Sequence, residues 1–482
     1  MASVGSIFDP PRGAGFQPAD PRVAGFQPAN PVGPVFDRPV YQPVNNRLQA
    51  SKRLVLMHDS HGLSDSIQFG LGLFYLLAML MNLGFAVYQF QKKNGLQAFV
   101  WTVVALIFLV HATGSLMLLG WTISDHFTDF INDIMNPVSY FVLACVGLAL
   151  GLIFRKFLTE PIVAWAILQL SFLAGGWAMT NGAFQSIITK PDNVPIVLLI
   201  YSVGFTTWLG MRQAVINDDR LARGEEPMEK LEEDKVLVWP DLVYTELLCM
   251  VICTFGLILW AYYLKAPLEQ PSSKSDIPNP SKAPWYFLGL QEMLVYFDPW
   301  MAGVVLPTFI LVGLIALPYI DFNTKGNGYY TFKQRSFAVT TFLIGFIVLW
   351  VTLIVLGTFL RGPNWNFFGP FEPWTPYKNL PLGNKNLSEI FWRDFMGQAM
   401  EGMKWYQREA PGILLVAGYM LLLPPLLART ILRPFFIKMG FIRFFILVTL
   451  IQFMASLPIK MVLRWTLNLK YIVFIPEAFL NI

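Results

Sequence analysis

The stretch PWMAGVVLPTFILVGLIALPYI, residues 299–320, contains no charged side chain. A run of about 20 such residues is long enough to cross the hydrocarbon core of a bilayer as one α-helix. Similar apolar runs occur near 67–90, 98–120, 136–154, 161–181, 194–211, 241–265, 337–360, 411–430 and 440–458. The sequence therefore predicts an all-α polytopic membrane protein with about ten transmembrane helices.

The composition agrees with this fold class and excludes several others. Of the 482 residues, 55% are hydrophobic and only 14% are charged, which is too apolar for an ordinary soluble protein. The net charge of +4 is small and lies in clusters at the ends of the apolar runs, so nucleic-acid binding is not indicated. The three cysteines, Cys145, Cys249 and Cys253, lie inside apolar runs, where packing is the expected role and a disulfide framework is not.

The basic connections predict one orientation in the membrane. Lysine and arginine gather at 91–93, 155–156, 212–235, 325–335 and 429–443, which are every second connection between the predicted helices. Because positive loops stay on the cytoplasmic side, these connections are expected to be cytoplasmic. The connections 266–298 and 361–410 then lie on the outer, positive side of the membrane.

Composition also divides the chain into regions. Residues 1–66 are expected to be a proline-rich arm with an interfacial segment, and 67–211 a five-helix membrane region of unknown family. Residues 212–240 form a charged, solvated linker, and 241–430 a second membrane domain. We expect 431–482 to add one helix and an amphipathic tail at the membrane surface. A secondary transporter is not favoured, because the halves share no repeat and Glu246 is the one notable intramembrane charge.

The outward connection 266–298 carries the residues best suited to chemistry. Pro284, Trp285 and Tyr286 precede the polar side chains of Gln291, Glu292 and Asp298, where the chain re-enters the membrane. Aromatic walls with a polar group beside lipid would suit a flat, redox-active quinone ring. Quinol oxidation releases protons, so Glu292 is the expected proton acceptor. The alternative is a carboxylate that is simply hydrated at the interface or paired with Lys282.

Residues 236–430 resemble the C-terminal domain of cytochrome b, which is a separate subunit IV in some complexes. The family carries Pro-Glu-Trp-Tyr at its quinol-oxidation site, and Ala283-Pro284-Trp285-Tyr286 stands in the matching place. Arg361-Gly362-Pro363-Asn364-Trp365 is similar to the family's Gly-Pro-x-x-Trp pattern. Trp285 and Tyr286 therefore carry over as pocket residues, whereas Pro284 replaces the family's proton-accepting glutamate.

This resemblance implies a subunit of a cytochrome bc-type quinol:cytochrome c oxidoreductase in a bacterial inner membrane. The expected partners are a dihaem cytochrome b subunit, a Rieske iron-sulfur protein with a [2Fe-2S] cluster and a c-type cytochrome, and the substrate is a quinol such as menaquinol. The Pro284-Trp285-Tyr286 connection would face the periplasm. The alternative is a non-redox scaffold or assembly subunit of a respiratory complex, in which Pro284 marks an inactive pocket.

The histidines argue against haem ligation by this chain. The family's cytochrome b core holds two haems through histidine pairs on two helices, whereas this chain has only His58, His61, His111 and His126. His111 and His126 are too far apart along a helix to ligate one haem together. We expect no metal ligand in the chain, although His111 remains open as either a hydrogen-bond donor within the membrane or a haem ligand shared with another subunit.

Overall fold

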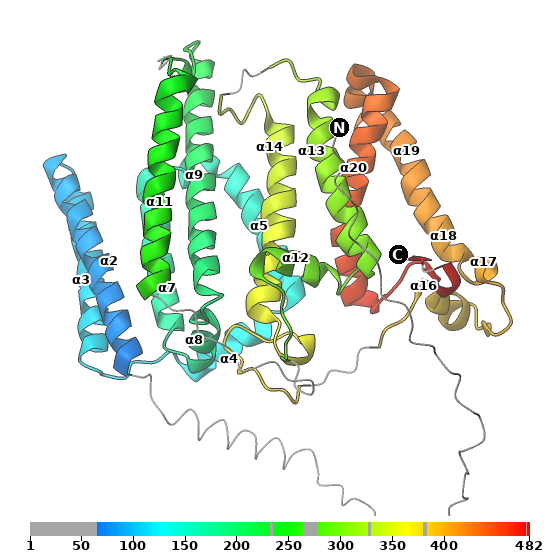
Figure 1. Cartoon of the computed structure of the whole chain (residues 1–482), viewed down its shortest axis with the longest axis horizontal. Coiled ribbons are helices and arrows are strands. Elements are labelled where there is room, and N and C mark those ends of the chain that lie inside the picture. Colours follow the sequence, from blue (N-terminus) through cyan, green and yellow to red (C-terminus); the bar gives the residue numbers. More distant parts are fainter. Residues whose placement is uncertain (1–64, 232–234, 264–277, 326–328, 379–382, 479) are drawn as a thin grey trace, which may run out of the picture. The chain divides into compact units, whose positions relative to one another are not determined.

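The structure, a computed structural model, describes residues 65–231, 235–263, 278–325, 329–378, 383–478 and 480–482. Of the N-terminal arm predicted over residues 1–66, all but the last two residues lie outside the described chain, among them His58 and His61. The first described helices are α2 (Asp65–Gln91), α3 (Gly95–Leu116), α4 (Asp125–Ile134), α5 (Pro137–Ile153), α6 (Arg155–Leu158), α7 (Pro161–Ala178), α8 (Gly182–Ile188), α9 (Val194–Ala222) and α10 (Met228–Leu231) (Figure 1).

The second half continues with more membrane helices, several of which contain π-helical stretches (η). They are η1 (Val238–Leu242), α11 (Val243–Tyr263), α12 (Trp285–Met293), η2 (Met301–Val305), α13 (Leu306–Ile320), α14 (Ser336–Leu343), η3 (Ile344–Val351), α15 (Thr352–Val355) and η4 (Leu356–Leu360). The remaining elements are η5 (Pro363–Trp365), α16 (Leu387–Glu389), η6 (Ile390–Phe395), α17 (Trp405–Arg408), α18 (Ala410–Ala417), η7 (Gly418–Leu422), α19 (Leu423–Arg429), α20 (Arg433–Leu467), β1 (Phe474–Ile475), η8 (Pro476–Ala478) and β2 (Leu480–Asn481).

The predicted all-α membrane architecture is confirmed. Nine helical segments of the described chain are long and apolar enough to cross a membrane, and α4 with α5 gives a tenth if that pair, bent by 82°, counts as one span. The bend arises because Asn136 is extended and caps α5: its Oδ1 accepts from Ser139 N at 2.9 Å, and Pro137 opens the helix. The start of α5 is thereby fixed beside the functional region described below.

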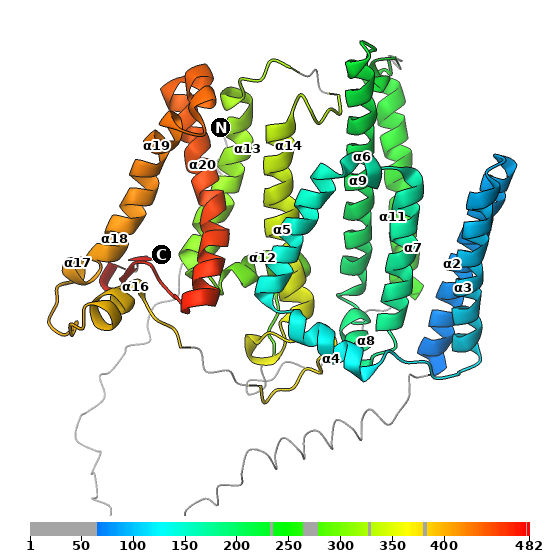
Figure 2. The ribbon, with the colours of Figure 1, turned by 180° about the vertical axis from the view of Figure 1, so that it is seen from behind.

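The largest apolar core joins segments that are distant in the sequence. Tyr296, Phe297, Leu353 and Met461 are among its buried members, and Phe141 of α5 packs against them. The views in Figures 1 and 2 show α5 beside the α14–η4 helix. This core therefore includes parts of the regions predicted at 67–211 and at 431–482. Side chains from both of these regions pack against the membrane domain predicted at 241–430.

The prediction for the C-terminal tail is wrong in its main point. Residues 457–467 continue α20 and do not lie as a separate amphipathic segment, and Lys460 is buried. The helix is interrupted earlier, at Gly440, whose φ of 76° and ψ of 179° are accessible mainly to glycine. Because Pro458 follows a long helical run whose neighbours pack against it, tertiary burial outweighs the helix-breaking tendency of proline.

The charged linker also differs from its prediction. Helix α9 extends to Ala222, and Asn217 and Asp218 are buried. Asn217 Nδ2 donates to Tyr330 O at 2.9 Å, and Lys333 N donates to the Asp218 carboxylate at 3.1 Å. The linker is therefore partly packed against a later connection and is not simply solvated.

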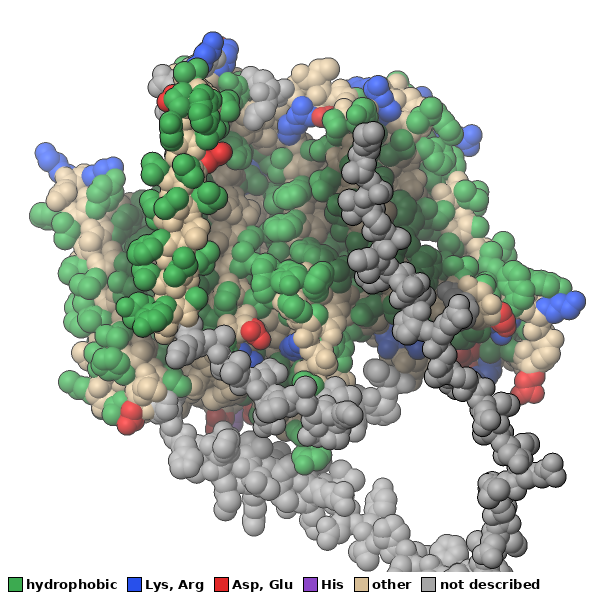
Figure 3. Space-filling model, viewed as in Figure 1, with side chains coloured by type: hydrophobic (Ala, Val, Ile, Leu, Met, Phe, Trp, Pro, Cys, Tyr) green, Lys and Arg blue, Asp and Glu red, His purple; other side chains and the backbone are tan. Residues whose placement is uncertain are grey.

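Three of the connections predicted to be cytoplasmic meet at one end of the helices. Lys156 forms an ion pair of 2.6 Å with Asp219, and Arg212 forms one of 3.0 Å with Glu160. Figure 3 shows lysine and arginine side chains along the upper edge, above a broad band of hydrophobic side chains. This grouping agrees with the charge pattern on which the orientation was predicted, although the side of the membrane remains a prediction.

Helix α11 makes no buried contact within the described chain. None of its side chains is buried, and the same holds for the apolar part of the whole span from Val238 to Tyr263. Cys249 and Cys253 are exposed, so the packing role expected for them is not seen within the described part of this chain. Glu246 is exposed as well.

A close contact near the C-terminus gives a test of this fold. A Cβ at Gly412 in α18 would collide with the backbone oxygen of Ile472, whereas a Cβ at Gly418 would meet only Leu422 Cδ1 at 3.9 Å. We expect Gly412→Ala to lower unfolding stability by about 1–3 kcal/mol, because the backbone must shift. Gly418→Ala, the matched control in the same span, should be neutral or stabilising by up to about 1 kcal/mol. Equal thermal midpoints for the two variants in detergent would contradict this packing.

Candidate functional site

The sequence Pro284-Trp285-Tyr286 begins the short helix α12. Pro284 is extended, with φ −52° and ψ 149°, and its ring disfavours a helical conformation at the preceding residue, so the helix starts at Trp285. The side chain of Gln291 accepts from Ala283 N and donates to Ser281 O, both at 2.9 Å, and thus ties the preceding loop to the helix. Trp285 and Tyr286 are 38% and 52% exposed, so they form a surface and not a buried wall.

Glu292, at the other end of α12, is fully buried and ion-paired with Arg361. Arg361 Nη2 donates to Glu292 Oε1 at 2.7 Å, and Arg361 Nε donates to Oε2 at 3.0 Å. Tyr296 OH donates to Oε1 at 3.3 Å. Both carboxylate oxygens therefore accept hydrogen bonds from charged or hydroxyl donors.

Lys282 lies apart from this pair. Its Nζ donates to Thr358 O at 2.7 Å and lies 4.6 Å from the centroid of the Trp374 ring. Burial, followed by the nearby charge of Lys190, lowers the pKa of Lys282 to about 7. The alternative that Glu292 is hydrated at the interface or paired with Lys282 is therefore wrong, because Arg361 is its partner.

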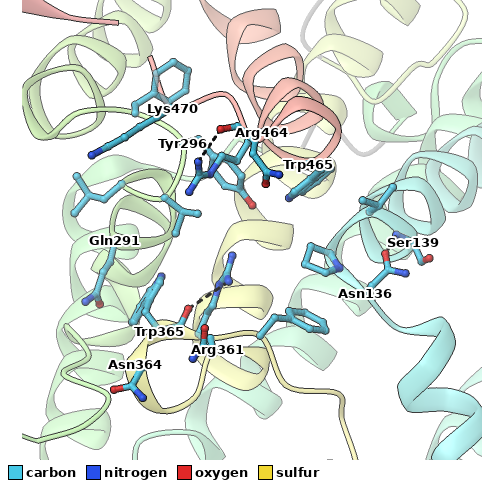
Figure 4. A pocket seen from close by; sticks show the side chains of 18 of the residues that line it. Asn136, Ser139, Gln291, Tyr296, Arg361, Asn364, Trp365, Arg464, Trp465 and Lys470 are labelled. Atoms are coloured by element: carbon cyan, nitrogen blue, oxygen red, sulfur yellow. Dashed lines mark hydrogen bonds between the residues drawn. The ribbon is translucent and has the colours of Figure 1, made fainter. Parts of the chain in front are cut away.

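A cavity of about 870 Å³ opens beside this cluster (Figure 4). Four separate segments supply its walls: the start of α5, the end of α12 with the turn after it, the loop after η4, and the end of α20 with the residues after it. The lining residues are Asn136, Pro137, Val138, Ser139, Gln291, Leu294, Val295, Tyr296, Phe297, Arg361, Asn364, Trp365, Asn366, Phe367, Arg464, Trp465, Asn468, Lys470 and Tyr471. Glu292 is not among them and reaches the cavity only through Tyr296 and Arg361.

Aromatic rings and polar groups alternate around the cavity. Figure 4 shows Tyr296, Trp365 and Trp465 around one space, with Arg361 and Arg464 directed toward it. Tyr471 OH donates to Asp298 Oδ1 at 3.0 Å. Burial, together with that carboxylate, raises the pKa of Tyr471 to about 12, so its hydroxyl stays protonated at neutral pH. A flat ring with two oxygen substituents would find both stacking surfaces and hydrogen-bond partners here.

The sequence-predicted residues are only partly brought together. Glu292 is close to the cavity, whereas Pro284, Trp285 and Tyr286 are absent from its lining. Sequence reasoning missed Tyr296, Arg464 and the pairing of Glu292 with Arg361. Arg361 opens the Gly-Pro-x-x-Trp-like segment, which was the one available signal, whereas Arg464 belonged to the tail that was expected at the membrane surface.

The described histidines are separated. His111 lies in α3 with Nδ1 2.8 Å from Ile107 O of the same helix, and the rings of Tyr75, Trp121 and Trp177 surround it at 5.5–6.0 Å. His126 belongs to α4. In the part of the chain that the structure describes, no three histidine, cysteine or acidic side chains gather in a way that could hold a metal ion.

Comparison with protein families identifies one segment of the chain. Residues 271–369 match the family model described as cytochrome b (C-terminal)/b6/petD. The matched segment contains α12, Glu292 and Arg361, and it supplies more than half of the cavity lining. No solved structure matches the chain.

Proposed function

We propose that this chain, whose residues 271–369 match the cytochrome b (C-terminal)/b6/petD family model, binds quinol for a bc-type quinol:cytochrome c oxidoreductase. The observation that best supports this proposal is the cavity of about 870 Å³. Tyr296, which lines the cavity, donates a hydrogen bond to Glu292, and Glu292 is buried and ion-paired with Arg361. The quinol ring would lie among Tyr296, Trp365 and Trp465.

Glu292 acts in this proposal as a proton acceptor reached through Tyr296. The Tyr296 hydroxyl lines the cavity and donates to Glu292 Oε1 at 3.3 Å, so it can pass its proton inward while it takes one from a bound quinol hydroxyl. Arg361 compensates the charge of the carboxylate through an ion pair of 2.7 Å. Oxidation of the quinol releases two protons, and its electrons leave to haem b and a Rieske cluster in partner subunits.

Pro284, Trp285 and Tyr286 take a separate role at the exposed end of α12. Their exposure, together with the hydrogen bonds that join the preceding residues Ser281 and Ala283 to the cavity-lining Gln291, supports a wall of the quinol site that a partner subunit completes. The partners would be the dihaem cytochrome b subunit, the Rieske protein and a c-type cytochrome of a bacterial inner membrane. The connection that carries Trp285 would then face the periplasm.

Replacement of Trp365 by alanine in the assembled complex tests the proposal. The loss of ring stacking should raise the KM for quinol about tenfold and leave the subunit composition unchanged. Trp405→Ala, which removes a half-exposed tryptophan away from the cavity lining, is the matched control. An unchanged KM in Trp365→Ala, with intact complex, would instead favour the non-redox scaffold.

A further inference from the structure

The cavity contains more positive charge than its acidic neighbours offset. Arg361, Arg464 and Lys470 line it, and among the described residues no carboxylate lines it. Glu292 compensates Arg361. Arg464 Nη1 donates only to a backbone oxygen, that of Asn468, at 3.3 Å, and Lys470 Nζ lies 5.0 Å from the Tyr471 ring centroid. Neither Arg464 nor Lys470 has a carboxylate oxygen within 4.0 Å in the described chain.

The groups around these two cations do not neutralise them. Asp298, next to the lining residue Phe297, accepts from the hydroxyl of Tyr471 and forms no ion pair with Arg464 or Lys470 in the described chain, so with Glu292 it offsets two of the three positive charges at most. On α20, the buried Lys460 lies one turn before Arg464, and its Nζ donates to Ile482 O at 3.4 Å, so it is not counted among the cations that face the cavity. From α5, the polar lining residues are the neutral Asn136 and Ser139. The arrangement therefore favours an anionic occupant, because the half-buried Arg464 and the exposed Lys470 add positive charge to the cavity wall that no ion pair within the described chain neutralises.

A neutral quinol would not require such an arrangement, whereas its monoanion would. We infer that the cavity binds the quinol as quinolate, with Arg464 and Lys470 stabilising the anionic oxygen; this rests on the proposed function. One quinol O–H bond breaks, its electron pair stays on the oxygen, and the proton leaves to water without any change in oxidation state. The first proton then needs no carboxylate acceptor, and this accounts for a proline at position 284 where the family has glutamate.

Two naphthoquinones of similar size test this assignment without turnover. The first, 2-hydroxy-1,4-naphthoquinone, is an anion at neutral pH, whereas 2-methyl-1,4-naphthoquinone is neutral. Binding of each to the purified, detergent-solubilised complex is followed by tryptophan quenching, and ionisation of the bound hydroxy compound by its visible absorption. Wild-type protein should bind the anion at least about tenfold more tightly than the neutral ring and lower its ionisation midpoint by about one pH unit.

The double variant Arg464→Gln/Lys470→Gln should lose this preference and the shifted midpoint, and should keep the wild-type affinity for the neutral ring within about twofold. The matched control is Arg433→Gln/Lys438→Gln, which removes two cations from the other end of α20; it should behave as wild type. Higher ionic strength should weaken only the binding of the anion.

Each other outcome has a distinct meaning. If wild-type protein binds neither probe, the quinone site itself is wrong. If both probes bind equally and the charge variant changes nothing, the quinone site stands and the quinolate inference is overturned. If phosphatidylglycerol displaces the anionic probe where phosphatidylcholine does not, and the charge variant abolishes that competition, the two cations hold a lipid phosphate and the inference is again overturned.

Discussion

Glu292→Gln is expected to slow quinol oxidation by the assembled complex about 100-fold. The amide oxygen can still accept from Arg361 and Tyr296, but the amide cannot hold a proton passed on by the Tyr296 hydroxyl. Because the change leaves the buried Arg361 without its anionic partner, the thermal midpoint and subunit composition of the variant complex are measured alongside its activity. The measurement is the steady-state rate with a saturating quinol and an excess of the c-type cytochrome. Because the change acts on proton transfer, kcat should fall while the KM for quinol stays within about threefold.

A second buried carboxylate provides the control for this variant. Glu409 is 1% exposed, pairs with Arg408 at 3.0 Å and accepts from Phe474 N at 3.0 Å, but it does not line the cavity. Glu409→Gln therefore removes an equivalent negative charge elsewhere, and its kcat should equal that of wild type. Full activity in Glu292→Gln, or an equal loss in both variants, would remove Glu292 from the proton path.

Arg361→Gln is expected to lower the unfolding free energy by about 3–5 kcal/mol. The substitution leaves the carboxylate of Glu292, which is 0% exposed, without its positive partner in a low-dielectric environment. The quantity to measure is the denaturant dependence of unfolding in mixed micelles. A fall of this size is large relative to the total stability of most domains, so reduced expression should accompany it.

The double variant Arg361→Gln/Glu292→Gln distinguishes the effect of an unpaired buried charge on stability from the effect of the lost hydrogen bonds. Removal of both charges should restore most of the stability lost in Arg361→Gln, because no uncompensated ion remains buried. Quinol oxidation should stay low in the double variant, since the proton acceptor is still absent. A double variant as unstable as Arg361→Gln would mean that the hydrogen-bond geometry of the pair matters more than its charge.

The spans were predictable because they depend on a property that the sequence carries locally. Residues 299–320 have no charge over a full membrane thickness, and the observed helix from Met301 to Ile320 follows that run closely. The end of α20 was not predictable in this way. Lys460 and Arg464 resemble the residues of a surface tail until their neighbours are known, and burial against α12 and α5 is a long-range property.

The candidate site shows the same limit. The sequence shows the carboxylate of Glu292 close to the aromatic residues Trp285 and Tyr286. Their closeness in the sequence led to the prediction that all three belong to one pocket. The helix α12 instead separates them: its start is exposed, and its end carries Glu292 into the core. The partner Arg361 lies 69 positions away, and no local pattern indicates which of the many basic residues pairs with a given carboxylate.

The residues that begin α5 give the cavity a structural role in addition to a chemical one. Asn136 and Pro137, which begin that helix, share the cavity wall with α12 and with the end of α20, so one bound molecule would touch segments that the chain otherwise brings together only by packing. By mass action, a ligand at 100 times its dissociation constant adds about 2.7 kcal/mol to the stability of the form that binds it. A molecule bound in the cavity would therefore also hold these segments together, and extraction that removes it would weaken the packing between the two halves of the polypeptide.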